Sequence, residues 1–346
     1  MTTDFLLKLI FGFAPVIVFL TALVHFDSFK LVRLPLVLYT LAGGALSAVA
    51  GYFINTELMD GLHVPYTDFM HFGAPLIEEF LTALVVIFLI QTNRIGFAFD
   101  AAILGFAAGT GFAIIENLVF LPDPDRGLAI WVIRGFGTAI MHGGTTAVFA
   151  MMGHIMALKA TNPGPHHYLP GFALAVALHT AFNYFLDRPV TSTVVMMLAL
   201  PAIMAALLYR DRKSIHHWLE VDFAAHSKLL AEIQSGAFEK SPEGRFLAKL
   251  HDRFSARVVD KMVYYIELHT ELILAAEEVL EAHERGEKIS VSSETKEKLI
   301  LLHEIEQEIG KTGLVALRPH LKFNRHEFWE IYMLEKEAGF VHPKAH

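Results

Sequence analysis

Apolar side chains fill long runs of the first 209 residues, and polar positions gather in the short segments between the runs. A helix needs roughly 20 residues to cross about 30 Å of hydrocarbon. Runs of that length predict seven transmembrane helices, near 5–25, 34–54, 67–90, 96–120, 128–158, 168–186 and 190–209.

The pattern changes near residue 212, where charged residues become dense. From Ser214 onward apolar residues recur at helical spacing, as at Phe246, Leu250, Phe254 and Val258. This periodicity predicts a soluble α-helical domain over residues 213–346.

Two long helices are expected within this domain. Ser241 followed by Pro242 is typical of a helix start, with serine as the N-cap and proline at the first helical position. One helix is therefore predicted from Pro242 to about Gly286 and another from about Ser293 to Lys311, where Gly313 can end it. Their amphipathic faces suggest self-association into a homo-oligomer or binding of a regulatory partner.

Composition agrees with a membrane protein. The chain is 54% hydrophobic and 18% charged, and its mean hydropathy is +0.44. We expect an all-α polytopic membrane bundle over residues 1–212, followed by the helical domain over 213–346. The absence of cysteine excludes disulfides and thiol chemistry, and the net charge of −8 argues against a nucleic-acid partner.

Loop charges predict the orientation in the cell membrane. Basic residues follow the odd-numbered spans: Lys30, Arg33, Arg94, Lys159, Arg210, Arg212 and Lys213. The other loops carry Glu57, Asp60, Asp123, Asp125 and Asp187, against Arg126 and Arg188. The positive-inside rule therefore places the N-terminus outside and the C-terminal domain in the cytoplasm. The first span begins with few charges and lacks a signal-peptide cleavage site, so we expect it to be retained.

Two adjacent carboxylates interrupt the third span, APLIEEFLTALVVIFLI, at Glu78 and Glu79. A charge at the bilayer centre costs on the order of 3 kcal/mol, so such residues usually face a protein interior or a wet cavity where they have a function. Neighbours on a helix point about 100° apart, so both carboxylates cannot reach one atom. We expect one of them at the reaction centre and the other bound to a partner.

Three further spans carry polar residues that can meet this pair. Glu116 shares a helix face with Gly105 and Gly109, and small residues let another helix approach closely. The next two spans bring Arg134, His142, His179 and Asn183. Under the inferred topology Glu78, Glu79, His142 and His179 all lie near the middle of their spans. Taken alone, either histidine is more often a buried hydrogen-bonding residue, and Arg134 most simply balances a carboxylate.

These residue types are compatible with several functions. A carboxylate can activate water while histidines stabilise an oxyanion, or glutamate and histidine can hold a metal that activates the water. Both routes hydrolyse an amide. A proton-coupled transporter also uses such residues, although the chain lacks the paired broken spans of many transporters. An inactive membrane scaffold is the third alternative.

A family resemblance supports the peptidase. The ordered segments APLIEEF, GFAIIENLVF, RGFGTAIMH and ALHTAFNYF resemble the PrsW family of intramembrane proteases, itself distantly similar to the CAAX-type prenyl endopeptidases. The resemblance covers roughly residues 35–210. By position it marks Glu78, Glu79, Glu116, Asn117, Arg134, His142, His179 and Asn183. It implies cleavage of membrane-tethered proteins, including anti-sigma factors in some bacteria.

One position departs from the family pattern. The paired glutamates often continue as EExxK, whereas Thr82 stands at the lysine position here. There are two alternatives: Arg134 takes the place of that lysine, or the two glutamates share a proton.

The sequence thus predicts an intramembrane peptidase that acts on membrane-anchored proteins in contact with lipid. Glu78 or Glu79 is the expected general base, and the two histidines polarise the carbonyl or hold a divalent metal such as Zn²⁺. The candidate metal ligands are Glu78, Glu116, His142 and His179. Glu116 orients a histidine or completes the metal shell, and Asn117, Arg134 and Asn183 are supporting residues.

Overall fold

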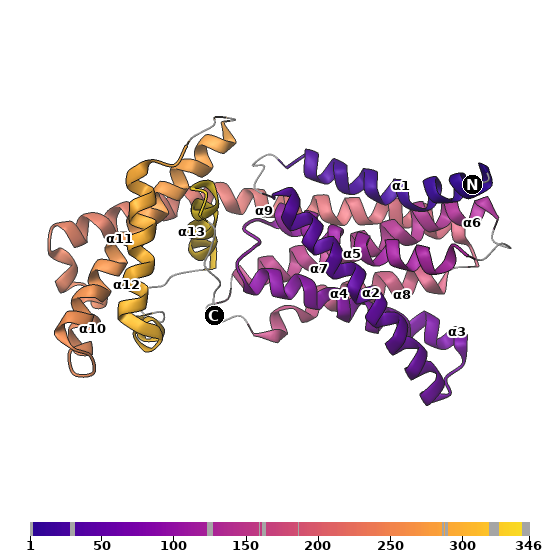
Figure 1. Ribbon diagram of the computed structural model, residues 1–346, viewed down its shortest axis with the longest axis horizontal. Coiled ribbons are helices and arrows are strands. Elements are labelled where there is room, and N and C mark those ends of the chain that lie inside the picture. Colours follow the sequence, from indigo (N-terminus) through magenta and orange to yellow (C-terminus); the bar gives the residue numbers. More distant parts are fainter. Residues whose placement is uncertain are drawn as a thin grey trace. The chain divides into compact units, whose positions relative to one another are not determined.

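Figure 1 presents a computed structural model of the chain. It describes residues 3–27, 32–122, 127–158, 160, 164–185, 187–285, 287, 290–317 and 325–340. These residues form helices and connecting turns, and no strand occurs among them. The chain divides into a first unit, Met1–Arg212, and a second unit, Lys213–His346.

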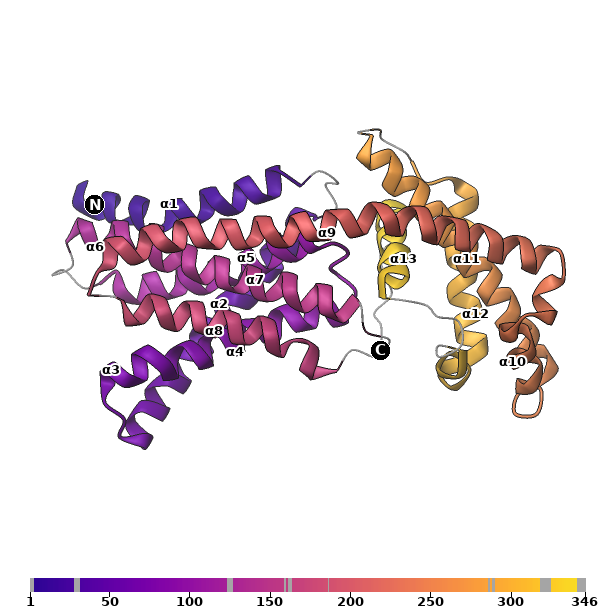
Figure 2. The same cartoon turned by 180° about the vertical axis from the view of Figure 1, so that it is seen from behind.

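The first unit is a helical bundle, as the apolar runs predict. Its elements are α1 (Thr3–His25), α2 (Leu34–Leu62), α3 (Tyr66–Asp68), η1 (Phe69–Gly73), α4 (Ala74–Gln91), α5 (Ala98–Phe120), α6 (Leu128–Ile133), η2 (Arg134–Thr138), α7 (Ala139–Leu158), η3 (Pro165–His167), α8 (Leu169–Tyr184) and the start of α9 (Pro189–Gln234). Figures 1 and 2 show α5 and α7 in the middle of this bundle, while the end of α2 extends beyond it together with α3.

In the described part of the chain, five helical segments are long and apolar enough to cross a membrane: Thr3–His25, Leu34–Gly61, Tyr66–Gln91, Ala98–Phe120 and Pro189–Tyr209. The predicted membrane bundle is confirmed, whereas two of the seven predicted spans lack this support. One corresponds to α6, η2 and α7, where histidines and threonines interrupt a mostly buried helix. The other corresponds to α8, whose 16 residues measure only about 24 Å.

The centre of the first unit is the contact between α5 and α7. Nearly all side chains of the first two-thirds of α5 are buried, so this part of the helix has no lipid-facing stripe. Its glycines allow α7 to approach, as predicted. A Cβ at Gly105 would lie 2.7 Å from the carbonyl oxygen of Thr146, and a Cβ at Gly109 would overlap the carbonyl group of His142.

Two π-helical turns precede helices that carry candidate site residues. The turn η1 leads into α4, and η2, which begins at Arg134, leads into α7. A π turn adds a residue to the helical repeat and is frequent at functional sites, because it changes the direction of the side chains that follow.

The second unit contains the end of α9, then η4 (Ala237–Lys240), α10 (Pro242–Leu250), α11 (Ala256–Glu284), α12 (Ser293–Leu317) and α13 (Arg325–Glu337). α11 packs against α12 and α13. His226 of α9 lies between two buried carboxylates, with Nδ1 3.2 Å from Glu277 and Nε2 3.7 Å from Glu327.

The long helix predicted from Pro242 to Gly286 is wrong. Ser241 does cap a helix start, since its hydroxyl accepts a hydrogen bond from the Gly244 amide at 2.9 Å. That helix ends at Leu250, and a turn separates it from α11. Gly286, the predicted end, lies outside the described residues.

The end of the next predicted helix also needs correction. The backbone leaves the helical conformation at Gly310, where φ is 72°, close to the predicted end at Lys311. The helix then resumes and reaches Leu317, so Gly313 lies inside α12 and does not end it.

Candidate functional site

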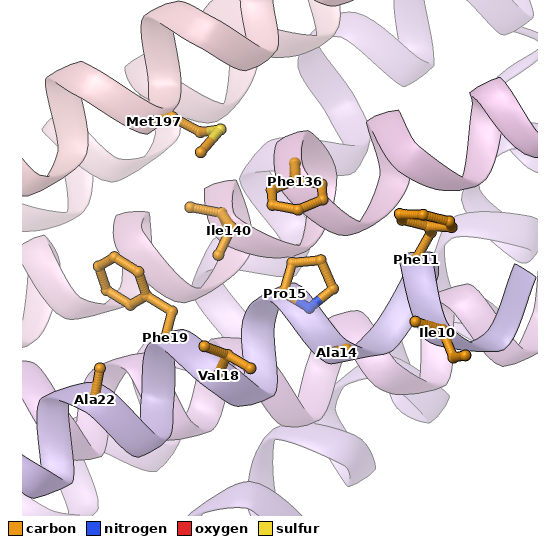
Figure 3. A pocket seen from close by; sticks show the side chains of 10 residues that line it. All are labelled: Ile10, Phe11, Ala14, Pro15, Val18, Phe19, Ala22, Phe136, Ile140 and Met197. Carbon is orange, nitrogen blue, oxygen red and sulfur yellow. The ribbon is translucent and has the colours of Figure 1, made fainter. Parts of the chain in front are cut away.

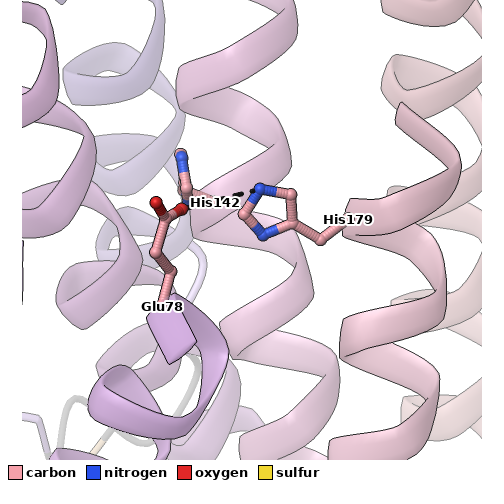
Figure 4. Close-up of side chains that lie close together, drawn as sticks. All are labelled: Glu78, His142 and His179. Carbon is pink, nitrogen blue, oxygen red and sulfur yellow. Dashed lines mark ion pairs between the residues drawn. The ribbon is translucent and has the colours of Figure 1, made fainter. Parts of the chain in front are cut away.

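Three predicted site residues from three helices converge. Glu78 of α4, His142 of α7 and His179 of α8 each offer one ligand atom, and these atoms lie within 4.8 Å of one another (Figure 4). The two imidazole rings are nearly perpendicular, at 86°. Both histidines are at most 3% exposed, so the group lies inside the bundle.

Glu79 holds His179 from the other side of the ring. Its Oε1 atom lies 2.9 Å from Nδ1 of His179 and accepts a hydrogen bond from the hydroxyl of Thr145 at 2.8 Å. Nε2 of His179 faces Glu78, with 3.7 Å to Oε2. The paired carboxylates therefore contact different atoms of one imidazole, as their angular separation on the helix requires.

Glu116 holds His142 in a similar way. One carboxylate oxygen lies 2.9 Å from Nε2 of His142, and the other accepts a hydrogen bond from Nη2 of Arg134 at 3.0 Å. Arg134 also donates through Nε to Oδ1 of Asn117 at 2.8 Å, and Asn117 donates to the carbonyl of Gly12 at 2.8 Å. This network connects α1, α5 and η2 to the histidine of α7.

Arg134 balances a carboxylate, as expected, but it does not take the place of the missing lysine. Arg134 contacts Glu116 and therefore does not replace the lysine beside the glutamate pair. The hydroxyl of Thr82 donates to the backbone carbonyls of Glu78 and Glu79, at 3.0 and 3.2 Å.

Asn183 lies one turn after His179 but contacts a different part of the bundle. Its amide nitrogen donates to the carbonyl of Met70 in η1 at 3.0 Å. It therefore fastens α8 to the π turn before the helix that carries the paired glutamates.

A protein-family model described as PrsW family intramembrane metalloprotease matches residues 33–207, slightly more than half of the chain. The chain belongs to the PrsW family. Searches of curated proteins and of solved structures gave no match. The protein is accordingly a multi-pass membrane protein and an intramembrane protease that acts on protein substrates within lipid. Family membership favours the protease over the transporter and the scaffold.

Two residues that contact the glutamates of this PrsW-family protein were not predicted from sequence. Thr145 donates to Glu79, and Nδ2 of Asn55 donates to Oε1 of Glu78 at 3.0 Å. Asn55 stands just beyond the predicted second span. Thr145 is one of two adjacent threonines in a helix, where such hydroxyls usually bond to their own backbone.

An apolar pocket lies apart from this cluster. It measures about 420 Å³ and is lined by side chains of α1 together with Phe136, Ile140 and Met197 (Figure 3). Its lining contains no titratable side chain, so it offers no group for peptide hydrolysis.

The convergent residues fit a divalent metal. Two imidazoles and one carboxylate are the donor set of several catalytic zinc sites, which leave a fourth position for water. Tetrahedral ligands at about 2.0–2.1 Å from Zn²⁺ lie about 3.4 Å apart, so the ligand atoms, now within 4.8 Å of one another, would move closer by up to about 1.4 Å. Both histidines also have a carboxylate on a ring nitrogen, as metal-bound histidines commonly do.

Proposed function

We propose that this protein cleaves membrane-anchored proteins at a metal-dependent centre formed by Glu78, His142 and His179. The observation that carries the proposal is the convergence of these three side chains, two of which are also held by further carboxylates. An ordinary buried histidine needs no such pair of partners. The donor set also agrees with the metalloprotease description of the family.

A bound divalent metal such as Zn²⁺ would polarise the scissile carbonyl and supply an activated water at neutral pH. The chain's own groups have distinct tasks around it. Glu79 and Thr145 fix the ring orientation of His179, and Glu116 does the same for His142. Glu78 would supply the carboxylate of the donor set.

A metal-free mechanism uses the same residues in other roles. Glu78 then acts as the general base, and the two histidines donate hydrogen bonds to the developing oxyanion. The 3.7 Å between Oε2 of Glu78 and Nε2 of His179 is too long for a direct hydrogen bond. This spacing is compatible with either mechanism, so a chelator experiment must separate them.

The substrate class follows from the membrane location and the family. We infer single-span or otherwise tethered proteins, with anti-sigma factors as the implied bacterial example. The proposed topology keeps the N-terminus outside and the second unit in the cytoplasm, where its helices can mediate self-association or bind a partner.

The test uses full-length protein in proteoliposomes with single-span reporter proteins. Each reporter carries two fluorescent proteins, one on each side of its transmembrane helix. Glu78→Gln should lower the cleavage rate by about 10²- to 10⁴-fold, since it removes the carboxylate charge and keeps the shape. Glu57→Gln, on an exposed position of α2, is the matched control and should cleave at the parental rate.

Metal dependence is tested in the same preparation. A chelator should abolish cleavage, and added Zn²⁺ should restore it. Unchanged cleavage with the chelator would favour the metal-free mechanism. Cleavage by Glu78→Gln at the parental rate would contradict both the metal-dependent and the metal-free mechanism.

A further inference from the structure

Asn55 gives Glu78 a partner that none of the family segments contains. Its Nδ2 atom donates to Oε1 of Glu78 at 3.0 Å, while the other carboxylate oxygen, Oε2, is the one that faces His179. The two oxygens of one carboxylate therefore have different neighbours. A hydrogen bond to Oε1 fixes the rotation of the carboxylate plane and so the direction of Oε2.

The other end of the Asn55 amide has no comparable partner. Its Oδ1 atom is buried, and among the described residues it forms no hydrogen bond. Burying an acceptor without a partner costs folding free energy, so native structures rarely contain one without a functional reason. The unpaired oxygen therefore points to a role of this amide beside Glu78.

Asn117 provides an internal comparison, because it is a buried asparagine of the same bundle. It donates to the carbonyl of Gly12 and accepts from Arg134, so both ends of its amide serve the fold. Among the described residues, the Asn55 side chain makes one hydrogen bond, which it donates to Glu78.

We propose that Asn55 is a positioning residue of the proteolytic centre, whose amide holds Glu78 with its second oxygen directed at the two histidines. This inference rests on the proposed function of Glu78. It assigns to α2 a role in the reaction, in addition to its role in packing against α5.

The test replaces Asn55 by leucine, which has a similar volume and no hydrogen-bonding group. Asn55→Leu should lower kcat toward the fluorescent reporters by about 10- to 100-fold with KM nearly unchanged, and lower Zn²⁺ affinity by a similar factor, as loss of an outer partner of a metal ligand does. Zn²⁺ affinity is measured by competition with a chromophoric chelator and needs no substrate.

Thermal unfolding distinguishes positioning from a structural role. The Tm of Asn55→Leu should fall by less than that of Asn117→Leu, because the variant breaks one hydrogen bond and also removes a buried unpaired oxygen. Asn117→Leu should lower Tm, because it breaks two hydrogen bonds. Thr56→Val, a change at an exposed neighbour on α2, should leave kcat, Zn²⁺ affinity and Tm as in the parent.

A fall in kcat or in Zn²⁺ affinity with a smaller loss of Tm than in Asn117→Leu supports the proposal. Parental values of both kcat and Zn²⁺ affinity, or their loss together with a Tm as low as that of Asn117→Leu, would overturn it. Glu78→Gln separates this failure from that of the proposed function. If Glu78→Gln is inactive and Asn55→Leu is fully active, only the role of Asn55 is wrong, whereas an active Glu78→Gln refutes the role of Glu78 itself.

Discussion

Replacing Arg134 by methionine tests the charge network that holds His142. The guanidinium of Arg134 donates to Glu116 at 3.0 Å and to Asn117 at 2.8 Å, and the arginine side chain is 11% exposed. Removing one partner of a buried ion pair typically costs about 3–5 kcal/mol, because the remaining charge stays buried. The Glu116 side chain is 28% exposed, so water can partly replace the arginine. We therefore expect a loss of about 3 kcal/mol.

The assay is unfolding of the purified protein in mixed micelles with increasing SDS. Arg134→Lys keeps the charge but not the forked geometry, so its stability should be intermediate. Combining Arg134→Met with Glu116→Gln should cost less than the sum of the two single changes, because no buried charge is then left alone.

Arg188→Met is the matched control for this experiment. Arg188 lies 3.9 Å from Asp187, and both side chains are more than 70% exposed. Exposed pairs of this kind contribute about 0–1 kcal/mol. Equal stability of Arg134→Met and Arg188→Met would refute the account of the buried network.

Three further changes test separate parts of the structure. Gly109→Ala places a methyl group against the carbonyl of His142 and should destabilise the bundle by about 1–3 kcal/mol, measured as a lower Tm in detergent; a parental Tm would contradict the close approach of α5 and α7. Thr145→Val preserves shape but removes the hydroxyl bonded to Glu79, so reporter cleavage should fall by about tenfold or more while Tm stays close to the parental value. Burial by itself lowers the pKa of His226, but hydrogen bonds to two glutamates outweigh it and raise the pKa to about 10. The protonated histidine therefore stabilises the second unit fully below its unfolded pKa of about 6.5, and this contribution is lost as pH rises towards 10. His226→Gln should remove that pH dependence of hydrogen-exchange protection in α11 and α13, corrected for intrinsic exchange, and an unchanged pH profile would contradict it.

The membrane helices were predictable because their length and apolarity are fixed by the bilayer. The prediction for 96–120 differs from α5 by two residues at its start. The break between α10 and α11 was not predictable in the same way. Apolar residues at Phe246, Leu250, Phe254 and Val258 keep helical spacing across the turn, and residues 251–255 contain neither glycine nor proline. Periodicity reports which residues face the core and does not reveal that the chain turns between them.

The site residues that could be predicted from the sequence are those whose burial costs much free energy. Ionisable residues in apolar spans, such as Glu78 and His179, are noticed because their burial requires partners. Asn55 and Thr145 are neutral polar residues, which membrane helices accommodate at lower cost. Their importance depends on contacts with Glu78 and Glu79 across 23 and 66 positions of sequence, which only the fold defines.

The central claim is that Glu78, His142 and His179 hold one catalytic metal. X-ray absorption at the zinc edge, on full-length protein in detergent loaded with Zn²⁺, tests this claim without requiring a substrate. The account predicts one tightly bound ion per chain with two imidazole nitrogens and oxygen ligands at about 2.0–2.2 Å, and loss of that ion in His142→Ala and His179→Ala but not in a variant of exposed His25. Weak binding that is the same in the parent and in the two site variants would contradict it.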